Sequence, residues 1–171
     1  ILYPYMNKTE KIVKEIIKNR KNALEDLDKI KRKMAERFSS RPLSNVELLE
    51  SYHKLVRNKR IKRDRKIEYL LTKRKVRSLS GIVNVSVLTK PYPCPGKCIY
   101  CPREDNIPQS YLKKEPAVQR AILTNFDPYL QIQTRLKSLV KTGHPIDKIE
   151  LRIIGGTWSY YPKKYQSWFV A

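Results

Sequence analysis

The first third of the chain has the hydrophobic spacing of amphipathic helices. Between residues 9 and 37, apolar side chains recur every three or four positions, and Lys or Arg covers the other faces. Thr9 is available as the N-cap, and residues 39–42 end the pattern. We therefore expect one amphipathic helix with core-facing residues Ile12, Val13, Ile16, Ile17, Leu24, Leu27, Ile30 and Met34.

A second helix is predicted to begin after Ser44. Ser44 and Glu47 have the spacing of a capping box, in which each side chain bonds a backbone N–H that the first turn leaves open. The apolar stripe of this helix is predicted to be Val46, Leu49, Tyr52 and Val56.

After residue 80 the pattern changes to strands alternating with helices. Residues 81–88 are rich in β-branched side chains and predict a largely buried strand, and residues 148–154 predict a second one. The first strand is followed by the Pro- and Cys-rich segment 89–103, which is predicted to be a loop. Strands separated by helices indicate parallel βα units.

Three helices are expected in this second part. Pro116 and Pro128 each stand at the first turn of a helix, and the second of these helices ends at Gly143. A third helix begins at Pro162. Two βα units do not close a barrel, so we expect the chain to be a piece of a longer protein whose remaining strands lie after residue 171.

The charge of the chain is strongly positive. It has 37 Lys and Arg against 16 Asp and Glu, a net charge of +21, and residues 1–80 hold 24 of the basic and 10 of the acidic side chains. Such a field concentrates polyanions, most commonly nucleic acid. An anionic membrane is the alternative, but both Trp residues lie outside the basic half, and no apolar run approaches the ~20 residues of a membrane helix. We expect RNA binding and no membrane association.

The basic side chains are densest between residues 54 and 77, where only Asp64 and Glu68 oppose them. A solvated surface is the simpler interpretation, but Ile61, Ile67 and Leu70 indicate that the segment is anchored to a fold. Lys and Arg contacts to phosphates release counterions without reading bases. The predicted phosphate-binding residues are Lys54, Arg57, Lys59, Arg60, Lys62, Arg63, Arg65, Lys66, Lys73, Arg74, Lys75 and Arg77.

All three cysteines of the chain lie within eight residues, with the spacing Cys94-x3-Cys98-x2-Cys101. Three thiolates can hold three irons of a [4Fe–4S] cluster and leave the fourth iron open. A radical S-adenosylmethionine (SAM) enzyme uses such an iron to bind the amino and carboxylate groups of SAM, and an electron from the cluster breaks the sulfonium C–S bond. We therefore predict a [4Fe–4S] cluster and SAM. Tyr100 stands at the aromatic position of the radical SAM signature, and this resemblance implies that it packs beside the adenine.

Other uses of the cysteines fit less well. Structural zinc prefers four ligands, and neither His53 nor His144 has ligand spacing to the three cysteines. A ferredoxin needs a fourth cysteine. An odd, tightly grouped set is a poor disulfide framework and favours a metal cluster in a reducing cytoplasm.

The second predicted strand ends in another candidate binding segment, Gly155, Gly156 and Thr157. In parallel βα barrels the chemistry lies at the carboxyl ends of the strands. Glycines there let the backbone approach a ligand closely, so the segment is predicted to border SAM. An ordinary turn is the alternative.

Together these motifs resemble the catalytic subunit of Elongator, closely over residues 80–171 and loosely over the basic half. Arg103 and Glu104 stand where that family usually has Gly-Gly. The segments that carry the resemblance include Ser80-Gly81-Ile82-Val83, Thr89-Lys90-Pro91-Tyr92-Pro93-Cys94-Pro95, Gly96-Lys97-Cys98-Ile99-Tyr100-Cys101-Pro102, Glu115-Pro116-Ala117, Asp127-Pro128-Tyr129, Gly143-His144-Pro145, Asp147-Lys148-Ile149-Glu150 and Gly155-Gly156-Thr157.

The resemblance implies a tRNA acetyltransferase that acts at C5 of the wobble uridine with acetyl-CoA, SAM and the cluster, and in which Lys148 contacts acetyl-CoA. It implies an α/β fold: a basic helical tRNA-binding region (1–78), then the first βα units of a partial radical SAM (β/α) barrel (79–171). The acetyltransferase domain would come after these units, so we expect this piece alone to be inactive. The implied partners are tRNA, an electron donor, and Elongator-like subunits or a second copy.

Two alternatives stay open. A radical SAM enzyme with another RNA substrate, such as a methylthiolating enzyme, would differ in the domain that comes after residue 171. A non-catalytic RNA-binding remnant is the other, and Arg103 and Glu104 favour it.

Overall fold

The computed structural model of the chain describes residues 7–19 and 26–171. The chain divides into two compact units. Residues 1–81 and 139–145 form the first, here named the helical unit, and residues 82–138 and 146–171 form the second, the sheet unit. None of the described helices is long and apolar enough to cross a membrane.

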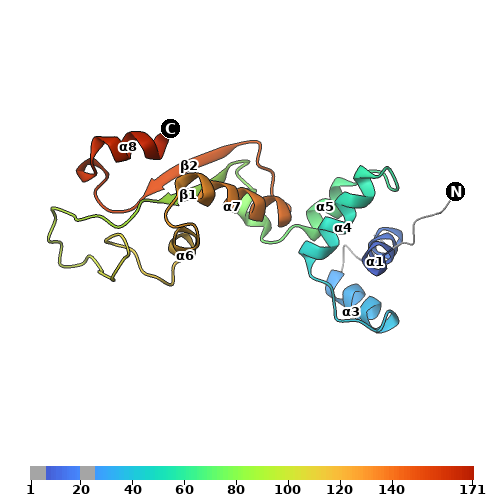
Figure 1. The fold of residues 1–171 in the computed structure, drawn as a ribbon. Coiled ribbons are helices and arrows are strands. Elements are labelled where there is room, and N and C mark those ends of the chain that lie inside the picture. Colours follow the sequence, from blue (N-terminus) through green and yellow to red (C-terminus); the bar gives the residue numbers. More distant parts are fainter. Residues whose placement is uncertain (1–6, 20–25) are drawn as a thin grey trace. The chain divides into compact units, whose positions relative to one another are not determined.

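The prediction of one helix between residues 9 and 37 is wrong, because the range contains two helices, α1 (Lys8–Lys18) and α3 (Leu27–Arg37) (Figure 1). Asn19 caps the end of α1, and Asp26 caps the start of α3. The predicted N-cap, Thr9, is wrong, because the Asn7 side chain accepts a hydrogen bond from the Thr9 N–H and starts the helix earlier. Asp26 caps α3 in the same way. The predicted core position Leu24 lies outside the described residues.

The helix predicted after Ser44 is α4 (Asn45–Arg57), and its capping box is confirmed. The Glu47 N–H donates to Ser44 Oγ at 3.3 Å, and the Ser44 N–H donates to the Glu47 carboxylate at 2.8 Å. Arg41 donates to the same carboxylate at 2.6 Å. The Arg41 hydrogen bond, followed by those from Ser44, lowers the pKa of Glu47 to about 2.

The buried face of α4 is centred slightly away from the predicted stripe. Val46 and Val56 are only half-buried, whereas Leu48 and Leu55 are fully buried. The reason is that α1 packs against this side of the helix. The remaining elements of the helical unit are α5 (Arg65–Leu71) and the short 3-10 turn η1 (Lys75–Ser78). Its core contains Ile12, Val13, Ile16, Met34, Leu48, Leu49, Tyr52, Leu55, Ile67 and Leu71.

The sheet unit contains two parallel strands, β1 (Val83–Leu88) and β2 (Ile149–Ile154). They pair in register from Val83 opposite Ile149 to Leu88 opposite Ile154. The predicted alternation of strands and helices is therefore confirmed. The predicted helix starts at Pro116 and Pro128 are confirmed as well. The helices and short turn of this part are α6 (Pro116–Leu123), α7 (Pro128–Lys141), η2 (Trp158–Tyr160) and α8 (Lys163–Val170).

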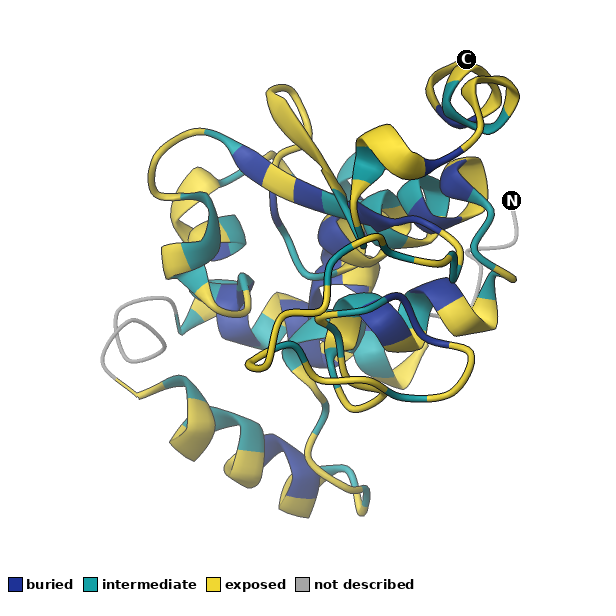
Figure 2. Ribbon diagram, turned by 90° about the vertical axis from the view of Figure 1, so that its left-hand side faces the viewer, coloured by how far each residue is buried: buried dark blue, intermediate teal, exposed yellow. Residues whose placement is uncertain are grey.

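The two strands differ in burial. In β1, Val83, Val85 and Val87 are buried and Asn84 is exposed. Figure 2 shows this strand mainly in dark blue, interrupted by yellow and teal. This strand was predicted to be largely buried. β2 is exposed along most of its length, and Leu151 is 53% exposed. Burial of a parallel strand requires cover on both faces, and the described helices cover mainly β1.

Candidate metal centre

The cysteine loop begins where β1 ends, as predicted. Residues 89–115 contain neither helix nor strand, and Figure 1 shows them as a long yellow-green segment between β1 and α6. The last residue of β1 is fixed by a side chain from α7. Leu88 N–H donates to Gln131 Oε1 and Gln131 Nε2 donates to the Leu88 carbonyl, both at 2.9 Å. The buried amide of Gln131 therefore makes the two backbone hydrogen bonds at Leu88 that a neighbouring strand would otherwise make.

The next two residues are bonded to β2 and to the segment around α8. Thr89 N–H donates to the Ile154 carbonyl at 2.9 Å, which extends the sheet pairing by one step. The Tyr161 hydroxyl donates to the Lys90 carbonyl at 2.7 Å and lies 2.8 Å from Thr89 Oγ1. Because the phenolic proton is used on Lys90, the Thr89 hydroxyl is the donor in the second contact. Lys90 N–H in turn donates to the Tyr165 hydroxyl at 3.0 Å.

Aromatic rings surround these bonds. Tyr161 is 3% exposed and is stacked with Tyr92 at 4.9 Å between centroids and with Tyr165 at 5.0 Å. The Lys90 ammonium lies 4.8 Å from the centre of the Tyr165 ring, within the range of a cation–π interaction. Among these hydrogen bonds, the one between Thr89 and Tyr161 is buried, and a hydrogen bond shielded from water is stronger than an exposed one.

The three cysteines carry free thiols; Cys98 is exposed and the other two are half-buried. Cys94 Sγ lies 3.1 Å from Thr157 Oγ1, so the structure brings the cysteine loop and the segment after β2 together. A side chain at Gly96 would lie 3.6 Å from the Sγ atoms of both Cys94 and Cys98. These two sulfurs therefore flank the same position of the loop.

The thiols do not form an assembled metal site. In the part of the chain that the structure describes, no group of three or more His, Cys, Asp or Glu residues is arranged to hold a metal ion. The donor set nevertheless fits the expected cluster, because it consists of three unbridged, solvent-accessible thiols in one loop, and thiolates are the usual ligands of iron–sulfur clusters.

Hydrogen bonds favour the thiolate form of Cys94. The hydrogen bond from the Thr157 hydroxyl, then the Gly96 N–H, lower the pKa of the Cys94 thiol, and the charge of Arg103 adds to this. Tyr100, which is 85% exposed, hydrogen-bonds Cys98; this contact, followed by the negative charge of Cys98, raises the pKa of its phenol. The position expected to contact adenine thus lies beside the thiols.

Gly155 and Gly156 lie at the carboxyl end of β2, close to the start of the cysteine loop. Gly155 has φ +151°, and a Cβ there would overlap the Thr89 hydroxyl. Burial raises the pKa values of Tyr111 and Tyr161, and the Gly155 and Gly156 N–H groups, which hydrogen-bond these two phenols respectively, oppose that shift.

Lys148 lies at the other end of β2. Its carbonyl accepts a hydrogen bond from the Val83 N–H at 3.0 Å, and its side chain is exposed. β2 has six residues, so Lys148 and Gly155 are separated by roughly 20 Å along the strand at ~3.3 Å per residue. The structure therefore does not bring Lys148 to the cysteine loop.

The predicted phosphate-binding residues all lie in the helical unit, and several of them already have partners. Lys54 and Arg60 lie 3.3 and 3.5 Å from the carboxylate of Glu10, and Arg63 lies 2.9 Å from that of Glu68. The Lys75 ammonium lies 4.5 Å from the centre of the Tyr69 ring. The other predicted cations are exposed, except for the half-buried Arg77; they are Arg57, Lys59, Lys62, Arg65, Lys66, Lys73, Arg74 and Arg77.

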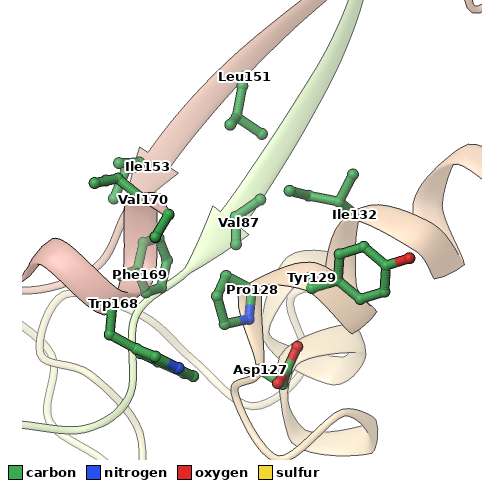
Figure 3. Close-up of a pocket in the computed structure, with 11 residues that line it drawn as sticks. Val87, Asp127, Pro128, Tyr129, Ile132, Leu151, Ile153, Trp168, Phe169 and Val170 are labelled. Carbon is green, nitrogen blue, oxygen red and sulfur yellow. The ribbon is translucent and has the colours of Figure 1, made fainter. Parts of the chain in front are cut away.

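An apolar pocket of about 440 Å³ lies on one face of the sheet unit, lined from β1, β2, α7 and α8. Figure 3 shows Leu151 and Ile153 of β2 on one side of it and Pro128 and Ile132 of α7 on the other. Asp127 is its one acidic lining residue, so the pocket lacks the ligand set that a metal cluster needs.

Sequence reasoning missed the residues that hold the start of the cysteine loop. Gln131 is fully buried, although it lies outside the predicted apolar stripe of its helix. Gln131, Thr89, Tyr161 and Tyr165 carry no local sequence signal, because their partners come from other parts of the chain.

Comparisons with known proteins find relatives that match the part of the chain with the cysteines. The chain is 49% identical over 107 residues to a tRNA uridine(34) acetyltransferase of Methanocaldococcus infernus and 48% identical over 107 residues to that of Methanocaldococcus jannaschii. Each match covers 59% of this chain and 20% of the relative. A continuous match of that extent includes the middle of the chain, and with it Cys94 and Cys98.

A third relative is Elongator complex protein 3 of Homo sapiens, which is 30% identical over 177 residues, covering 93% of this chain and 30% of the human protein. The expected resemblance to the catalytic subunit of Elongator is confirmed. No protein-family model matches the chain. The chain spans about a fifth of the length of the archaeal relatives and under a third of the human one.

Proposed function

We propose that this chain is the tRNA-binding and cluster-binding part of an Elongator-like enzyme that modifies C5 of the wobble uridine of tRNA, using acetyl-CoA, SAM and a [4Fe–4S] cluster. The observation that carries the proposal is the 49% identity to a relative named tRNA uridine(34) acetyltransferase, in a match that includes Cys94 and Cys98. The proposed modification at C5 is the first step toward a carboxymethyl-type uridine.

Cys94, Cys98 and Cys101 would hold the cluster. When bound, the cluster supplies the electron that cleaves SAM reductively. The chain's own contribution is placement: Cys94 is held beside Thr157, and Tyr100 and the segment 155–157 lie next to the thiols. We propose that these residues border SAM.

The sheet unit supports a partial radical SAM barrel, because its two strands are parallel and are separated by helices. In this proposal residues 79–171 contribute the first βα units of that domain. Lys148 would contact acetyl-CoA at the amino end of β2, apart from the cysteine loop.

Residues 1–78 would bind tRNA through the phosphate backbone. The support is the net charge and the exposed cations that make no ion pair with the described residues, Lys62 and Lys66 among them. Association would then fall with salt, by about 0.9 in log K per log unit of salt for each phosphate neutralised. The proposed setting is the cytoplasm, with an electron donor and Elongator-like subunits or a second copy as partners.

Mass spectrometry of tRNA nucleosides tests the proposed reaction. Deleting the gene should remove the carboxymethyl-type modification at uridine 34, and restoring it with Cys98→Ala should not bring the modification back. Unchanged uridine 34 in the deletion strain would refute the reaction. It would favour another RNA substrate or the non-catalytic remnant.

The remnant has one observation in its favour. Glu104, one of the two residues in place of the family's Gly-Gly, accepts a hydrogen bond from the Lys113 N–H at 2.7 Å and so has a structural use of its own. A gene restored with Cys98→Ala that modifies uridine 34 normally would favour this alternative.

A further inference from the structure

The backbone that leads from β1 into the cysteine loop is bonded at three consecutive residues. Gln131 bonds both main-chain groups of Leu88, the Thr89 N–H is bonded to β2, and both main-chain groups of Lys90 are bonded to tyrosine hydroxyls. Surface loops usually leave such groups to water. A loop start fixed to this degree restricts where the next residues of the loop lie.

Tyr161 is the centre of this arrangement. Its hydroxyl accepts from the Thr89 side chain and donates to the Lys90 carbonyl, at 2.8 and 2.7 Å. Its buried ring is stacked between Tyr92 and Tyr165. One side chain therefore contacts three of the residues that precede the first cysteine.

The first cysteine is restricted in turn. Cys94 comes four residues after Lys90, and four residues span at most about 14 Å. Its sulfur contacts Thr157, four residues before Tyr161 in the chain. The other two thiols have no such contact with another element among residues 7–19 and 26–171: Cys98 is exposed, and the Cys101 thiol bonds the carbonyl of its own neighbour, Pro102.

We propose that Tyr161 is a positioning residue for the metal centre. It fixes the start of the loop, so that Cys94 is in place before the cluster binds. Cys98 and Cys101 then move to the cluster when the cluster binds. The inference rests on the proposed cluster-binding role of the cysteines. It explains why the structure holds Cys94 against a second element while the three thiols are not assembled.

Two variants remove the contact from opposite sides. Tyr161→Phe keeps the stacked ring and removes the hydroxyl, and Thr89→Val keeps the shape of the partner and removes its donor. Tyr160→Phe is the matched control, because Tyr160 is adjacent, is 49% exposed, and its hydroxyl makes no hydrogen bond with the described residues. If Tyr161→Phe fails to fold, Thr89→Val carries the test.

Two measurements are made on each folded variant. Hydrogen exchange of the metal-free chain should be faster at the Thr89 and Lys90 amides in both variants. After anaerobic reconstitution, iron should be lost to a chelator about two- to tenfold faster than from the wild type, the factor that one hydrogen bond is typically worth. Tyr160→Phe should match the wild type in both.

The outcomes separate this inference from the proposed function. A wild-type chain that binds no iron overturns the cluster itself. A wild-type chain that binds the cluster, with variants that exchange faster but lose iron at the wild-type rate, overturns the positioning role, because a merely structural tyrosine would behave in that way. Equal exchange and equal iron loss in all variants overturn it as well.

Discussion

Substitution of Gly155 is expected to destabilise the fold for two reasons. Its φ of +151° is strained for any residue with a side chain, and its Cβ would overlap the Thr89 hydroxyl. Gly155→Ala is therefore expected to lower the free energy of unfolding by about 1–3 kcal/mol, measured by urea denaturation.

Gly156→Ala is the matched control for this substitution. A Cβ there would lie no closer than 3.9 Å to another residue, the nearest atom being the Tyr161 hydroxyl. The change should stay within about 0.5 kcal/mol of the wild type. Equal losses in the two alanine variants would contradict the contact between Gly155 and Thr89.

Glu47 is predicted to make stability depend on acid pH. The folded state holds its pKa at about 2, below the ordinary value of 4.5, through Arg41 and the Ser44 cap. Because the pKa is depressed on folding, the contribution is fully present above pH 4.5 and is lost as the pH falls toward 2. The site is solvent-exposed, so we expect only about 0.5–1 kcal/mol from the cap and the ion pair.

The measurement compares urea midpoints of the wild type and Glu47→Gln between pH 2 and pH 6. The difference should be largest at pH 6 and should shrink toward pH 2. Glu36→Gln is the control, since Glu36 is exposed and makes no ion pair with the described residues. A difference that does not change with pH would show that Glu47 acts through its shape and not its charge.

Single residues could be predicted where the signal is local. The cysteine spacing, the Ser44 capping box and the prolines at helix starts each depend on a few neighbouring positions. The bonds of Thr89 to Tyr161 could not be predicted, because they join residues 72 positions apart. The choice of Thr9 as a cap failed because Asn7 competes for the same role two residues earlier.

At the scale of elements, α8 offers a test of which aromatic side chains hold the sheet unit together. Phe169 is 7% exposed and packs on Trp158 and Tyr165, whereas its neighbour Trp168 is 52% exposed. Phe169→Ala should lower the free energy of unfolding by about 3 kcal/mol, and Trp168→Ala by about 1 kcal/mol or less. Denaturant unfolding that ranks the two in the opposite order would contradict the packing of α8.

The start of α5 and the residues just before it test how the basic region uses its charges. Lys62 and Lys66 are exposed and make no ion pair with the described residues, whereas Arg63 is paired with Glu68. Replacing both lysines by Ala should reduce the slope of log K for tRNA against log salt by about 2, since each phosphate contact contributes ~0.9. Filter binding over a salt series measures this slope.

Arg63→Ala is the control for that experiment. It removes a cation that the protein already neutralises, so the slope should change by less than it does for the lysine pair. A larger effect of Arg63→Ala would show that the ion pair with Glu68 opens when tRNA binds.

The existence and type of most elements could be predicted from the sequence, but their burial could not. Apolar spacing and proline positions predicted the two strands and α4, α6, α7 and α8. The same spacing predicted one helix where the structure has α1 and α3, because apolar spacing carries no information about the caps at Asn19 and Asp26. The exposure of β2 depends on what covers it, which its own residues do not encode.

At the scale of the whole molecule, the central claim is that three thiolates of one loop hold an iron–sulfur cluster. The free thiols, the fixed position of Cys94 and the similarity to tRNA uridine(34) acetyltransferases all support it. The two units have separate proposed tasks, tRNA binding in the first and cluster binding in the second. The cluster can therefore be tested without tRNA.

The most direct measurement is the iron and sulfide content of the anaerobically reconstituted chain. We predict about four of each per chain, the composition of a [4Fe–4S] cluster, and a clear loss of both in Cys98→Ala. Tightly bound zinc in place of iron, or an iron content that Cys98→Ala leaves unchanged, would contradict the claim.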